Sequence, residues 1–196
     1  MLHFIYRLWG HTDYYADNDS GKFATIELYH WDFGNLAVDF VWDPLTLGQW
    51  LQPTQLAEYD VIISSSGAWA GMAGETVDWY RENLEAFCER IETAYSDYQP
   101  DATHNQTRIF LTAPPYPPLL TGNSVSRRDQ RTNPKASVWR DTAEAVVSNH
   151  GWRVVDQFDR AMPVMLEMLA SDGLHLSPGP SHTSIVDEVI AKAGLC

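Results

Sequence analysis

Three short apolar segments, separated by stretches with helical periodicity, constrain the fold of this chain more than any other feature. Val61–Ile63, Arg108–Thr112 and Trp152–Asp156 have the length and composition of strands that are buried on both faces of a sheet. Between them, Glu75–Tyr95 and Val138–Asn149 place apolar residues three or four positions apart, which is typical of amphipathic helices. Alternating strands and helices predict an α/β fold in which a parallel sheet is flanked by helices on both faces.

The other patterned segments lie at the two ends of the chain. Phe23–Tyr29 and Leu36–Trp42 alternate apolar and polar residues on either side of Asp32–Asn35, so they predict two strands joined by a turn. Ala161–Leu169 predicts a short helix, and Ser184–Ala193 predicts a final one. We expect the β-hairpin to be an addition to the parallel sheet.

Length and charge limit the organisation of the chain and its partners. At 196 residues, with 44% hydrophobic residues, the sequence suits a single domain over residues 1–196, in which residues 1–22 are assigned to no element. The net charge of −13 repels phosphate backbones and anionic lipid, so nucleic acid is not an expected partner. No apolar window is long enough for a membrane segment, and the histidines lack the spacing of a metal site. We therefore expect neither a metal nor another cofactor.

The cysteines and two N-glycosylation sequons do not by themselves identify the cellular compartment of the protein. Cys88 and Cys196 allow at most one disulfide, and the helical pattern around Cys88 favours a buried thiol. Asn18-Asp-Ser and Asn105-Gln-Thr match the acceptor pattern for N-glycosylation.

Two loops carry candidate chemistry. Asp172-Gly-Leu-His175 presents a carboxylate and an imidazole together, so Asp172 can orient His175 while the ring acts as a general base. Ser64–Trp69 follows a predicted strand directly and offers hydroxyl and backbone N–H groups of the kind that stabilise an oxyanion. Both segments also fit a simpler interpretation, an Asp-Gly turn and a Ser/Gly turn with a packing tryptophan. Reactive groups in open parallel sheets collect at the carboxyl ends of strands, where both loops are expected.

These segments, in this order, resemble motifs of the SGNH (GDSL-like) hydrolase superfamily. Asp60–Trp69 is similar to the block in which an Asp and an apolar strand lead to Asn-x-Gly-x-Trp. Trp42-Asp-Pro44 resembles the Trp-Asp-Pro that precedes this block, and Asp172–His175 resembles the C-terminal Asp-x-x-His block. Within the superfamily, the chain resembles the PC-esterase-like branch of glycan O-acyl esterases and acyltransferases.

The resemblance implies a fold, a reaction and a set of site residues. The fold is a flavodoxin-like, three-layer α/β domain, and the reaction is hydrolysis or transfer of an acyl group, typically acetyl, carried by carbohydrate or another small acyl ester. Asp172 and His175 are implied as catalytic residues, Ser65 and Gly67 as support for the oxyanion, and Trp69 as a contact for substrate. Together with the two sequons, the resemblance suggests the secretory pathway or the extracellular space.

Two departures qualify this implication. The family's Gly-Asp-Ser nucleophile block is absent, and Ser65 stands where the family has Asn. We expect that the first strand and the nucleophile block are missing from this chain, and that it is inactive alone. The alternative is a non-catalytic carbohydrate-binding or interaction domain that kept the fold. The sugar, the acyl group, the acyl acceptor, the redox state of the cysteines and the oligomeric state stay open.

Overall fold

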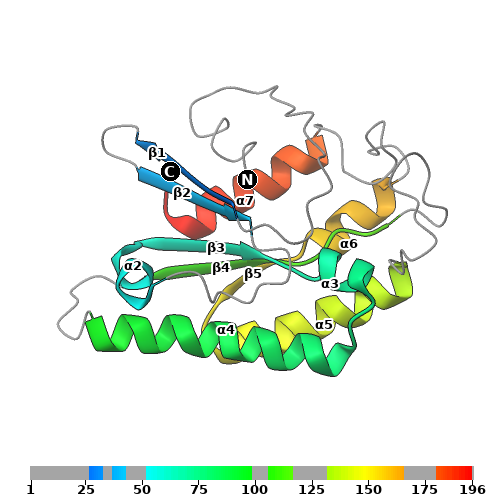
Figure 1. The fold of residues 1–196 in the computed structure, drawn as a ribbon. Helices are drawn as coiled ribbons and strands as arrows, with labels where there is room; N and C mark the ends of the chain where they lie inside the picture. The colour runs from blue at the N-terminus through cyan, green and yellow to red at the C-terminus, as the bar shows by residue number, and fades with distance from the viewer. Residues whose placement is uncertain are drawn as a thin grey trace.

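The computed structural model shows an α/β chain built around one parallel sheet (Figure 1). The residues it describes are 27–32, 37–42, 52–98, 106–116, 132–165 and 180–195.

The sheet consists of the three apolar segments found in the sequence. β3 (Val61–Ser65), β4 (Thr107–Leu111) and β5 (Arg153–Val155) lie in the order β3-β4-β5. Both pairings are parallel, and the register aligns Ser65 with Leu111 and Leu111 with Val155. The prediction of neighbouring parallel strands is therefore confirmed.

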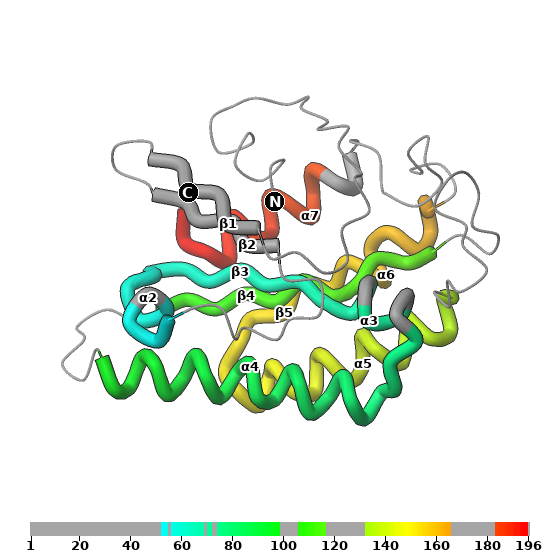
Figure 2. The backbone as a smooth tube through the Cα atoms, viewed as in Figure 1, coloured from blue at the N-terminus to red at the C-terminus, as the bar shows by residue number. Residues whose placement is uncertain are grey.

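Helices cover both faces of the sheet, as predicted. The long helices α4 (Val77–Tyr98) and α5 (Asn133–Asn149) lie along one face, and α7 (Pro180–Ala193) lies along the other (Figures 1 and 2). Strand residues alternate between the faces, because successive side chains of a strand point in opposite directions. Phe110 packs with α4 and α5, whereas its neighbour Ile109 packs with α7.

Shorter elements complete the described chain. α2 (Pro53–Glu58) precedes β3, and α3 (Ala68–Ala73) follows it. α6 (Gln157–Ala161) follows β5 and continues into a 3₁₀ turn, η2 (Met162–Val164). The sequence did not predict α2 or α3, since six-residue helices are too short to display helical periodicity.

α5 and α7 begin earlier than their apolar spacing indicates, and α7 begins at Pro180 instead of the predicted Ser184. α5 begins at Asn133, five residues before the predicted Val138, because the Thr132 side chain accepts a hydrogen bond from the Lys135 N–H and so caps the helix. The predicted helix Ala161–Leu169 is not found with these bounds, because α6 ends at Ala161, residues 162–164 form the 3₁₀ turn η2, and residues 166–169 lie outside the described part. α6 begins at Gln157, where the Asp156 carboxylate caps it by accepting from the Asp159 N–H. Capping residues, and not the apolar pattern, set the starts of α5 and α6.

The predicted β-hairpin is present as a separate two-stranded sheet. β1 (Glu27–Asp32) pairs antiparallel with β2 (Ala37–Trp42), with Glu27 opposite Trp42. Asp32 belongs to the strand and not to the predicted turn, and residues 23–26 and 33–36 lie outside the described part.

Cys88 is a buried free thiol on α4, as the helical pattern predicted. Within the described ranges, no helix combines the length and the apolar character needed to cross a membrane. The same ranges contain no group of three or more His, Cys, Asp or Glu side chains placed to hold a metal ion.

Candidate functional site at the carboxyl edge of the sheet

Polar residues gather where the three parallel strands end. Ser65, Leu111 and Val155 are aligned at this edge, and the residues that follow them are Ser66, Thr112 and Asp156. α3 and α6 begin here as well (Figure 1). Because the carboxyl edge of a parallel sheet is the usual place for reactive groups, we take this edge as the candidate site.

The last residue of β3, Ser65, and the first residue after it, Ser66, lie in different environments. Ser65 is exposed, whereas Ser66 is buried and its Oγ shares a hydrogen bond of 2.9 Å with the Tyr80 hydroxyl. Gly67 is buried with φ of 102°, a value that L side chains rarely adopt. Ser65 is therefore the serine of this pair whose hydroxyl is open to a ligand.

An aromatic pair supports this turn from the side of α4 and α5. The rings of Tyr80 and Trp139 are stacked, with centroids 5.0 Å apart and an interplanar angle of 12°. Burial raises the pKa of Tyr80 well above its ordinary value, and the hydrogen bond from Ser66 offsets only part of this effect. Tyr80 therefore remains a neutral phenol that can both donate and accept.

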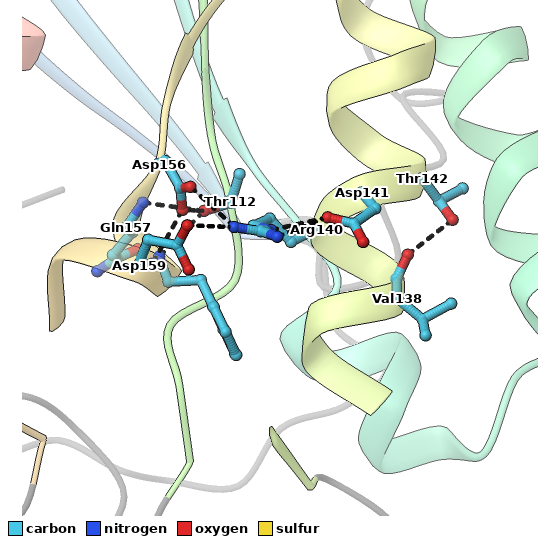
Figure 3. Close-up of polar contacts among 9 residues, drawn as sticks. Thr112, Val138, Arg140, Asp141, Thr142, Asp156, Gln157 and Asp159 are labelled. Atoms are coloured by element: carbon cyan, nitrogen blue, oxygen red, sulfur yellow. Dashed lines mark hydrogen bonds and ion pairs between the residues drawn. The ribbon is translucent and has the colours of Figure 1, made fainter. Parts of the chain in front are cut away.

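Arg140 connects α5 to the start of α6, which directly follows β5 (Figure 3). Its Nη1 lies 3.2 Å from Asp156 Oδ2 and 2.5 Å from Asp159 Oδ2, and its Nη2 lies 2.7 Å from Asp141 Oδ1. The guanidinium also stands over the Phe158 ring, 5.6 Å from its centroid. Burial opposes the charge, but the hydrogen bond to Asp141 and the neighbouring carboxylates outweigh it and raise the pKa of Arg140.

Thr112 fixes the start of α6 from the end of β4. Its side chain is fully buried, and its Oγ1 accepts from the backbone N–H groups of Gln157 at 2.9 Å and Phe158 at 3.3 Å. The hydroxyl donates to Asp156 Oδ1 at 3.3 Å. The arrangement satisfies N–H groups that a helix leaves free at its first turn, so it holds α6 against the sheet.

A small apolar cluster packs beside these polar contacts at the carboxyl edge. Tyr116, Ala136 and Phe158 are buried together, with Ala68 of α3 packed against them. Asn133 Oδ1 accepts from the Tyr116 N–H at 2.6 Å, which ties the loop after β4 to the start of α5. The loop after β4 and the starts of α3 and α5 thus pack together next to the turn after β3.

The structure describes some of the predicted site residues but not others. Ser65 is the last residue of β3 and Gly67 lies in the turn after it, so both stand at the carboxyl edge. The predicted loop Ser64–Trp69 is shorter in the structure, because β3 continues to Ser65 and α3 begins at Ala68. Asp172 and His175 lie outside the described residues, so their pairing stays a prediction. Trp69 belongs to α3, but its side chain is outside the described part.

Sequence analysis missed several residues that shape this edge, among them Tyr80, Trp139 and Arg140. Their partners are distant in the chain, and the spacing of apolar residues carries no information about such contacts. Asp156 could have been found, because an Asp directly after a strand and three residues before another Asp is a capping signal.

Comparisons with solved structures identify the fold. No protein-family model matches the sequence, and no curated protein matches it significantly. The lipase/acylhydrolase from Enterococcus faecalis is 25% identical with a TM-score of 0.49, and the match covers 69% of this chain and 62% of that one. An α/β hydrolase from the metagenome of Lake Arreo, Spain, is 18% identical with a TM-score of 0.46, covering 69% and 60%. A peptidoglycan O-acetylesterase is 13% identical with a TM-score of 0.51, covering 74% and 41%.

The chain has an SGNH-hydrolase-like fold, as its motifs predicted. The match to the peptidoglycan O-acetylesterase carries this conclusion, and at 13% identity it concerns the fold alone. The chain spans less than two thirds of each of these three proteins.

Proposed function

We propose that this chain belongs to a lineage of acyl-ester hydrolases or O-acyltransferases that act on O-acetylated carbohydrate by Ser-His-Asp chemistry. The observation that carries the proposal is the segment Ser65–Gly67, which begins at the last residue of β3 and continues into the turn at the carboxyl edge of an SGNH-hydrolase-like sheet. The turn combines an exposed hydroxyl with backbone N–H groups at the edge where such folds place their chemistry.

In this proposal each site residue has a defined role. A serine hydroxyl attacks the acyl carbon while His175 takes its proton, and His175 then returns the proton to the departing sugar oxygen. Asp172 holds the His175 ring in the required tautomer. Ser65 and Gly67 stabilise the negative charge on the carbonyl oxygen, and Trp69 offers a flat apolar surface for the sugar ring.

The nucleophile sets the expected activity. The sequence contains no Gly-Asp-Ser, and its Asp-Ser pair is Asp19-Ser20, which follows a polar segment and not an apolar strand. We therefore propose that these 196 residues do not hydrolyse esters by themselves. A triad without its serine loses about a millionfold in rate and retains about a thousandfold over water.

The activity test uses p-nitrophenyl acetate with the purified chain. We expect no hydrolysis that depends on His175, so wild type and His175→Ala should give equal rates. Robust hydrolysis that disappears in both His175→Ala and Ser20→Ala would overturn this expectation and make Ser20 the nucleophile. Hydrolysis that disappears in Ser65→Ala would give Ser65 a nucleophilic role instead.

Ligand binding separates the esterase lineage from the alternative, a non-catalytic carbohydrate-binding domain. The absence of the nucleophile motif favours that alternative. Methyl 6-O-acetyl-glucoside and its parent, methyl glucoside, can be titrated in parallel while the amide resonances of the chain are followed by NMR. An esterase lineage predicts that only the acetylated sugar shifts the amides of Ser65–Gly67. Equal binding of both sugars contradicts it and supports the binding domain.

A further inference from the structure

The Tyr80 hydroxyl is the point at which α4 touches the turn after β3. It hydrogen-bonds Ser66 Oγ at 2.9 Å, and a Cβ placed on Gly67 would lie 3.4 Å from it. Both Tyr80 and Ser66 are buried, with 2% and 7% of their surfaces exposed. The consecutive residues Ser66 and Gly67 therefore both lie next to the Tyr80 hydroxyl.

The position of this hydroxyl is fixed by the packing of its ring. Tyr80 is stacked on Trp139, and the same Cβ on Gly67 would lie 3.6 Å from Trp139 Cε3. On the third side, the Cβ of Ala113 would lie 3.4 Å away. α4, α5 and the loop after β4 thus enclose Gly67, and Tyr80 contributes the polar contact among them.

The Ser66–Tyr80 hydrogen bond decides which groups of the turn remain available. It occupies the Ser66 hydroxyl inside the protein and leaves the Ser65 side chain exposed at the edge. The backbone N–H groups between Ser65 and Gly67 must point at a ligand oxygen if they are to stabilise it.

We propose that Tyr80 is a positioning residue, whose hydroxyl holds Ser66 and so orients Ser65 and Gly67 toward an acyl oxygen. The orientation toward an acyl oxygen rests on the function proposed above, whereas the anchoring of the turn does not. Tyr80 acts through the turn and does not itself touch substrate.

The test compares Tyr80→Phe with Tyr98→Phe. Tyr80→Phe deletes the hydroxyl and keeps the stacked ring, while Tyr98 lies on the same helix with 52% of its surface exposed and serves as the matched control. In amide hydrogen exchange without ligand, Tyr80→Phe should accelerate exchange in the segment containing Ser66 and Gly67 and leave the β4 amides unchanged. Tyr98→Phe should change neither.

The ligand measurement adds a readout that a purely structural role does not move. Tyr80→Phe should weaken binding of methyl 6-O-acetyl-glucoside about threefold to tenfold, the range of one lost hydrogen bond. Ser66→Ala should do the same, and the double variant should be no worse than either single one, because both remove one interaction.

The outcomes separate this proposal from the function on which it rests. If wild type binds no acetylated sugar, the proposed function fails, and the exchange measurement alone decides whether Tyr80 anchors the turn. Unchanged exchange at Ser66 and Gly67 in Tyr80→Phe overturns the positioning role. So does unchanged affinity in a wild type that binds, or an additive double variant.

Discussion

Replacing Thr112 with Val tests how strongly the carboxyl edge holds α6. Val has nearly the same shape as Thr but lacks the hydroxyl, so the change leaves the buried packing in place. The N–H groups of Gln157 and Phe158 lose their acceptor, and Asp156 loses a donor. Thr and Val are therefore not equivalent at this position despite their equal size.

The lengths of these hydrogen bonds set the expected magnitude. The bond to Gln157 N is 2.9 Å and counts at full strength, whereas the two at 3.3 Å exceed the usual range and count for less. A buried donor left unsatisfied costs about 1–3 kcal/mol, so we expect Thr112→Val to lower the free energy of unfolding by about 2–3 kcal/mol. Thr112→Ser keeps the hydroxyl and removes one buried methyl group, which costs about 1 kcal/mol.

Urea unfolding followed by tryptophan fluorescence measures both variants against wild type. The prediction is that Thr112→Val is less stable than Thr112→Ser, although Val retains more apolar surface. If Thr112→Val is as stable as Thr112→Ser, or more stable, the hydrogen bonds at the start of α6 do not hold it to the sheet and the argument is wrong.

Two further predictions concern Gly67 and Cys88. Gly67→Ala should lower the free energy of unfolding by about 1–3 kcal/mol, because φ of 102° is a value that L side chains rarely adopt; an unchanged free energy in urea unfolding would contradict this reasoning. Burial, followed by the nearby charge of Glu92, raises the pKa of Cys88 to about 12, so folding is favoured while the thiol is neutral. That stabilisation should be complete below about pH 9, the ordinary pKa of a thiol, and should decline as pH rises toward 12. In urea unfolding, the free energy of unfolding of Cys88→Ala should therefore fall less steeply over this pH range than that of wild type.

The sheet could be predicted from the sequence because burial on both faces requires apolar residues at consecutive positions of a strand. Val61–Ile63 and Ile109–Leu111 are apolar at every position, and only a strand covered by helices on both sides requires that. Helix starts were harder to predict, since α5 begins directly after the capping residue Thr132, which lies outside the apolar pattern. Apolar spacing reports the buried stripe of a helix and not its first turn.

The site was predictable only as far as chain order determines it. Parallel topology places the ends of β3, β4 and β5 at one edge, so the position of the turn after β3 followed from the strands themselves. The contact between Ser66 and Tyr80 did not follow, because it spans a turn, a short helix and the start of α4. Nothing in the local sequence of either residue reports the other.

The alternation of strand side chains nevertheless separates the serines of the turn. Ile62 packs with the α4 and α5 core, and Ser66, four residues later, continues on that side and meets Tyr80. Ser65 has the opposite parity, and its register partner Leu111 packs against α7. Ser65 therefore faces the layer of α7, the helix that follows Asp172 and His175 in the chain.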